Sequence, residues 1–121
     1  MSEIKAGSSK IGMDGDSVHI WEHLKAGDHG EPTSFASVVG LHAQVTGHLG
    51  AATVVLQGSN VAQPTDGDWA LLCDRAGYPI EFTTLDTFKV PESIARWVRP
   101  LVAGSDEATD VNVLLMVRGI S

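Results

Sequence analysis

The feature that most constrains the fold is a long alternation of residues in the first half of the chain. Every second residue from Phe35 to Val45 falls on one face of an extended segment, and the residues between them are more polar on average. Successive side chains of a β-strand point to opposite faces, so this pattern predicts a strand with one buried face. Residues 47–50 indicate a turn and residues 52–57 the next strand, which together predict a β-hairpin.

Other short apolar runs, bounded by turn residues, predict further strands, and no segment keeps a helical period over ~11 residues. These runs lie near residues 18–22, 69–74, 80–85, 96–102 and 111–117. In the last run both alternating sets are at least partly apolar, which predicts a central strand covered on both faces. Pro100 predicts an edge strand or a bulge, because proline cannot donate a hydrogen bond to a neighbouring strand.

A length of 121 residues fits one domain, and the spacing of the strands is typical of an all-β fold. We expect a β-sandwich of about seven or eight short antiparallel strands over residues 16–121. Residues 1–15 are rich in Gly and Ser, with isolated apolar residues at Ile4, Ile11 and Met13. Such a stretch cannot form a core of its own. We therefore expect a flexible N-terminal arm, which is either a disordered tail or a segment that orders against a partner.

The formal net charge of −7 disfavours direct binding to nucleic acid, because a negative protein repels the phosphate backbone. The same acidic surface can match a basic patch on a protein partner. No apolar run approaches the ~20 residues that cross a membrane, and residues 1–10 lack the apolar core of a signal peptide. Cys73 is the only cysteine, which excludes an intrachain disulfide and fits synthesis in a cytoplasm.

Residues 19–23, His-Ile-Trp-Glu-His, match the H-x-x-E-H pattern of one group of zinc proteases. That chemistry needs the motif on a helix, where both histidines reach one zinc ion. The flanking residues predict a strand, on which His19 and His23 would lie ~13 Å apart. The sequence also has no nucleophile motif, phosphate-binding loop or full calcium loop. We therefore expect no enzyme activity, no metal and no cofactor.

Three tryptophans are the largest aromatic residues of the chain. Trp69 and Trp97 lie in apolar runs, so we expect them to pack in the core. Trp21 is flanked by polar residues and is the best candidate for an exposed aromatic contact with a partner.

Four short motifs carry a resemblance to a known family. They are VVLQGSN at 54–60, DWALL at 68–72, RWVRP at 96–100 and TDVNVLL at 109–115. From about Val39 to Arg118 the chain resembles small virion proteins of tailed bacteriophages. Within that group it is most similar to the head decoration, or cement, proteins of short-tailed phages.

The resemblance implies a jelly-roll-like β-sandwich that binds the major capsid protein of the assembled head as a dimer or trimer. It implies a place on the outer surface of the capsid after synthesis in the host cytoplasm, and no catalytic residues. We expect the contact to involve the arm and the strand near Trp21, namely Ile4, Ile11, Met13, His19, Trp21 and His23. Two alternatives stay open: a tail, fibre or head–tail joining component, and a carbohydrate-binding β-sandwich module.

Overall fold

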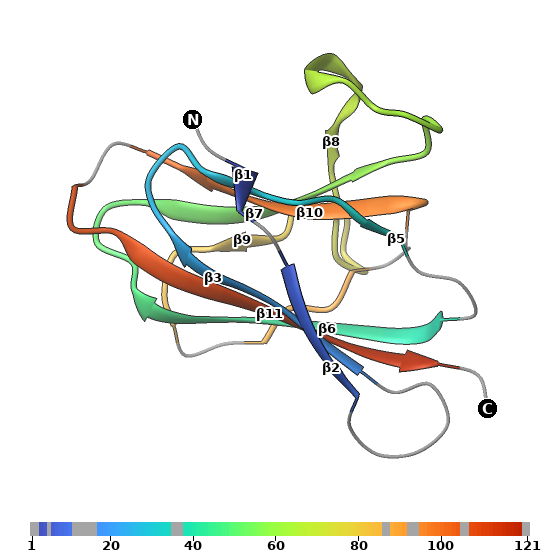
Figure 1. The fold of residues 1–121 in the computed structure, drawn as a ribbon, viewed down its shortest axis with the longest axis horizontal. Helices are drawn as coiled ribbons and strands as arrows, with labels where there is room; N and C mark the ends of the chain where they lie inside the picture. Colours follow the sequence, from blue (N-terminus) through green and yellow to red (C-terminus); the bar gives the residue numbers. More distant parts are fainter. Residues whose placement is uncertain are drawn as a thin grey trace.

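The computed structural model describes residues 3–4, 6–10, 17–34, 38–85, 88–91, 95–104 and 107–119. Over these ranges two β-sheets pack face to face, and one 3-10 turn, Asp66–Asp68, is the only helical element (Figure 1). Apart from one short parallel pair, the paired strands are antiparallel. The predicted all-β sandwich is confirmed.

One sheet has four strands in the order β2-β3-β11-β6. Their bounds are Ala6–Lys10 for β2, Ser17–Leu24 for β3, Asp110–Gly119 for β11 and Val38–His48 for β6. β11 pairs with β3 on one side and with β6 on the other, which confirms the central position predicted for the last strand. Along the outer edge of β6, Ala43 and Lys89 exchange two backbone hydrogen bonds of 2.8 and 3.0 Å.

The second sheet follows the order β1-β4-β10-β7-β8, with β5 also paired to β10 and β9 to β7. Its strands are β1 (Glu3–Ile4), β4 (His29–Gly30), β5 (Thr33–Ser34), β7 (Thr53–Ser59), β8 (Ala70–Leu71), β9 (Glu81–Phe82) and β10 (Trp97–Ala103). β7 and β10 form its longest ladder, and β1 and β4 are the parallel pair.

The core lies between the facing sides of the two sheets. In β6 the alternate residues Leu41, Ala43 and Val45 are buried, as their period-2 pattern predicts. They pack in one cluster with inward residues of β3, β11 and the opposite sheet. That cluster includes Trp21, Leu24, Val54, Leu56, Phe82, Val98, Val102, Val111, Val113 and Leu115.

The predicted hairpin between the strands at 38–48 and 53–59 is wrong. β6 pairs with β11, whereas β7 pairs with β10 in the other sheet. Residues 49–52 therefore cross between the sheets, and Leu49 and Ala52 are buried in the core on the way. A short connection fits a hairpin or a crossing, and the two buried apolar residues favour the crossing.

β10 is an inner strand, and its register with β7 runs through Pro100 without a shift, so the expected edge strand or bulge at Pro100 is also wrong. The backbone N–H of Val102 donates to the Asp28 carbonyl oxygen, on the side where β4 lies. Backbone directions alternate along a strand, so the nitrogen of Pro100 points to that same side. It falls between β4, which pairs at Leu101, and β5, which pairs nearer the start of β10. The N–H group that proline lacks would therefore point into this gap, where no described strand pairs with Pro100.

Two strands occupy part of the segment expected to be a flexible arm. β2 pairs antiparallel with β3, and β1 pairs with β4, so this part of the chain extends both sheets. The open edge of β3 offers the hydrogen-bonding groups that such a segment needs. Ile4 lies in β1, whereas Ile11 and Met13 lie outside the described residues. The jelly-roll connectivity stays a prediction.

Candidate protein-binding surface

The outward side of the four-stranded sheet carries a stripe of apolar side chains. Residues opposite each other in an antiparallel pair point to one face, and their neighbours along the strands point to the other. Val113 and Trp21 are paired and fully buried, so this pair faces the core. The adjacent pairs of β11 and β3 therefore face outward; they are Leu114 with Ile20 and Met116 with Val18.

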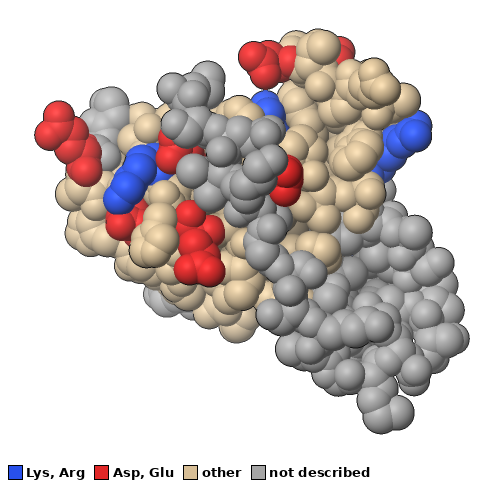
Figure 2. Space-filling view, viewed as in Figure 1, with Lys and Arg blue, Asp and Glu red and all other residues tan. Residues whose placement is uncertain are grey.

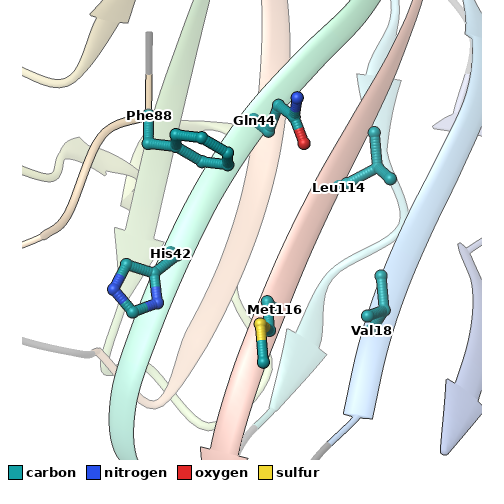
Figure 3. Close-up of a pocket in the computed structure, with 6 residues that line it drawn as sticks. All are labelled: Val18, His42, Gln44, Phe88, Leu114 and Met116. Atoms are coloured by element: carbon teal, nitrogen blue, oxygen red, sulfur yellow. The ribbon is translucent and has the colours of Figure 1, made fainter. Parts of the chain in front are cut away.

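β6 and the segment along its edge complete this surface. Gln44 pairs with Leu114, and His42 with Met116, so both β6 residues share the outward side. Phe88 lies over β6 beside them, and the groove between these side chains runs along β11 (Figure 3). We call this surface the outer face; its residues are Val18, Ile20, His42, Gln44, Phe88, Leu114 and Met116.

The outer face is accessible in the described structure. The Phe88 side chain is 66% exposed, His42 is exposed, and Leu114 and Met116 are half-buried. The prediction that β11 is covered on both faces is therefore wrong for its outward side, as far as the described residues extend. Apolar residues on both sides of a strand require cover, but the sequence pattern does not say whether the same chain provides it.

The groove of the outer face carries no formal charge, since its described lining holds no Asp, Glu, Lys or Arg. Acidic side chains gather instead where β3 ends and β11 begins, at the left of Figure 2. Exposed Glu22 and Glu107 belong to this region, together with Asp110.

Trp21 lies in the core, so the expectation of an exposed indole is wrong. Its side chain is 0% exposed, and its Nε1–H donates to the Glu31 carbonyl oxygen at 3.0 Å. A Cβ added to Gly30 would lie 2.6 Å from the indole, which shows how closely the backbone packs there. The polar neighbours Glu22 and His23 were misleading, because they point to solvent while Trp21 points inward.

The H-x-x-E-H segment lies on β3, which confirms the predicted strand. Glu22 and His23 together oppose Asn112 in a β-bulge, where His23 has a φ of 58° and its backbone N–H donates to Asn112 Oδ1 at 3.1 Å. His19 is half-buried, and this burial lowers its pKa. Within the described ranges, no group of three or more His, Cys, Asp and Glu residues could hold a metal ion.

His23 remains accessible to a partner, with 71% of its side chain exposed. Its Nδ1 lies 3.1 Å from Asp110 Oδ1, and Lys25 Nζ donates to Asp110 Oδ2 at 2.8 Å. The hydrogen bond from Lys25, followed by that from His23, lowers the pKa of the Asp110 carboxyl group. The bulge thus presents a small network of charged and polar groups at the acidic side of the molecule.

The other two tryptophans are half-buried, so the expectation that they lie in the core is wrong. Trp69 covers the guanidinium of Arg99, whose Cζ lies 4.2 Å from the ring centroid. Trp97 lines a shallow depression with Pro32 and Pro64, and its buried Nε1 has no hydrogen-bond partner among the described residues. Trp69 and Trp97 belong to the loop and strand of the other sheet, far from the outer face in the topology.

No segment that the structure describes forms a helix long and apolar enough to cross a membrane. Comparisons with protein-family models, with curated protein sequences and with solved structures found no match.

Proposed function

We propose that this chain is a non-enzymatic virion structural protein, which binds the assembled head of a tailed phage and stabilises it. The observation that carries the protein-binding role is the uncharged apolar outer face on a chain with a net charge of −7. Contiguous exposed apolar surface of this kind marks protein contacts in folded proteins. The phage assignment rests on the sequence motifs of residues 39–118.

The rigidity of the fold suits this role. A sandwich with paired strands loses little conformational entropy on docking, so more of the contact energy remains as affinity. A protein that binds only the assembled shell stabilises that shell by linkage. The acidic groups near the bulge, including Glu22 and Asp110, supply a second surface that would favour a basic region of the coat protein.

Co-sedimentation with phage heads tests this function. Purified protein is mixed with undecorated heads, with unassembled coat protein and with free tails. We expect saturable binding to the heads alone. Binding to tails alone would instead support a tail, fibre or head–tail joining component, and binding to none of them would refute a role in the virion.

The carbohydrate-binding alternative depends on Trp97, the half-buried tryptophan that lines a depression together with Glu31 and Gln63. Aromatic faces beside polar side chains are typical of sugar contacts. A glycan array with the natural chain and with Trp97→Ala tests it. Glycan binding that the substitution removes would favour this alternative over the virion role.

A further inference from the structure

We propose that the outer face is covered by the same face of a second copy of this chain, related by a two-fold axis. The inference rests on the protein-binding role proposed above and names the partner of that surface. Three features carry it: the absence of charge in the described groove, the size of the sheet, and the different residue sizes on its two sides.

The distribution of charge favours a second copy over a basic partner at this surface. Two chains of net charge −7 repel each other, and the repulsion is strongest where their acidic regions approach. The described groove has no formal charge, so two copies can meet there without bringing carboxylates together. A basic coat protein would gain more from the acidic region near Glu22 and Asp110, which this pairing leaves open.

The sheet is large enough for a dimer contact. Four strands at ~4.8 Å spacing and ~8 residues in length give a projected area of about 500 Å². Side-chain relief raises the accessible area above the projected area, towards the ~800 Å² per partner of a standard interface. Sheet-on-sheet packing is also the arrangement that already forms the core of this fold.

The two sides of the outer face carry residues of different size. On the β6 side Phe88 is 66% exposed and lines the groove with His42 and Gln44 (Figure 3). On the opposite side, β2 pairs Gly7 with Ile20 and Ser9 with Val18, and glycine and serine are small residue types. A two-fold axis parallel to the strands, in the plane of the contact, brings Phe88 of each copy over the β2 side of the other. The face is therefore complementary to itself, as an isologous dimer requires.

Sedimentation velocity of the purified chain over a dilution series tests the pairing. We expect a species of twice the 12.8 kDa chain mass that dissociates on dilution. Leu114→Glu should weaken the dimer at least ~100-fold, because the two-fold axis places two carboxylates in one desolvated contact. Phe88→Glu tests the same face from outside the sheet, should Leu114→Glu fail to fold. Leu71→Glu is the matched control, since Leu71 is 46% exposed on the other sheet, and this variant should stay dimeric.

A natural chain that is monomeric throughout the series overturns the inference. A dimer that persists in folded Leu114→Glu and Phe88→Glu variants also overturns it, because the contact would then lie elsewhere. The co-sedimentation experiment is read separately. A monomer that binds heads refutes the pairing and keeps the proposed function, whereas a dimer that binds no part of the virion refutes the function and keeps the pairing.

Discussion

Replacing Trp21 by phenylalanine tests whether this indole stabilises the core. Trp21 is 0% exposed, and its Nε1–H donates to the Glu31 carbonyl oxygen at 3.0 Å. The hydrogen bond accounts for about 1 kcal/mol of stability. The smaller ring leaves a cavity of ~40 Å³, which destabilises by about 1 kcal/mol at ~24 cal/mol per Å³. We therefore expect Trp21→Phe to lower the free energy of unfolding by about 2 kcal/mol.

The same substitution at Trp97 is the matched control. Trp97 is half-buried, and its buried Nε1 lacks a hydrogen-bond partner among the described residues. Removing an unsatisfied donor offsets part of the lost packing, so Trp97→Phe should change stability by less than ~0.5 kcal/mol. If both indoles had the environments that their sequence neighbours suggest, Trp97→Phe would be the more damaging change.

Urea unfolding followed by far-ultraviolet circular dichroism measures both variants. A loss of about 2 kcal/mol corresponds to a midpoint lower by about 1 M for a chain of this size. A Trp21→Phe midpoint within error of the natural chain, or a larger shift for Trp97→Phe, would refute the assignment of Trp21 to the core.

Three further substitutions test other parts of the structure. Gly30→Ala should destabilise by about 1–3 kcal/mol, because its Cβ would lie 2.5 Å from a proline ring; Gly67→Ala, with no atom within 4 Å, should not destabilise through contacts. Thr109→Val should lower stability by about 1–3 kcal/mol in thermal unfolding, because it leaves the Leu49 carbonyl without its 2.9 Å partner. Thr109→Ser keeps this hydroxyl donor, loses only a buried methyl group and should destabilise less. The pKa of Asp110 is lower in the folded protein than its ordinary value of 3.8, so the ionised carboxylate stabilises the fold at pH values above 3.8. This stabilisation is lost as the pH falls through the folded-state pKa. Asp110→Asn should therefore lower the melting temperature at pH 7 but not at a pH well below 3.8; equal effects at both would contradict this linkage.

The sequence predicts the fold class and the alternation of β6 because a half-buried strand has a local period of two residues. It does not predict which strand β6 pairs with. A connection as short as residues 49–52 is compatible both with a hairpin and with a crossing between the sheets. The buried Leu49 and Ala52 decide between them, and their burial depends on the opposite sheet. Likewise, Pro100 lies in an inner strand only because β4 and β5 leave a gap beside it.

The sequence indicates the candidate surface only in part, for a similar reason. The partly apolar set of Leu114 and Met116 indicated that the second side of β11 needs cover. Whether the cover comes from the same chain or from a partner is decided by the tertiary arrangement. Trp21 was assigned to the wrong environment, because sequence neighbours do not determine which face of a strand turns inward. His23 is exposed, as the predicted contact requires, and it lies in a β-bulge. The sequence pattern does not reveal this bulge.

The rate at which hydrogen peroxide oxidises Met116 tests directly whether the outer face is covered. Mass spectrometry measures this rate against an added reference of N-acetylmethionine. Oxidation of a methionine thioether depends on its access to solvent. We expect Met116 to oxidise several-fold more slowly in protein bound to phage heads than in protein diluted until it is monomeric. Equal rates in the two states would show that the outer face stays open when the protein functions, and would refute the proposed covering of this face.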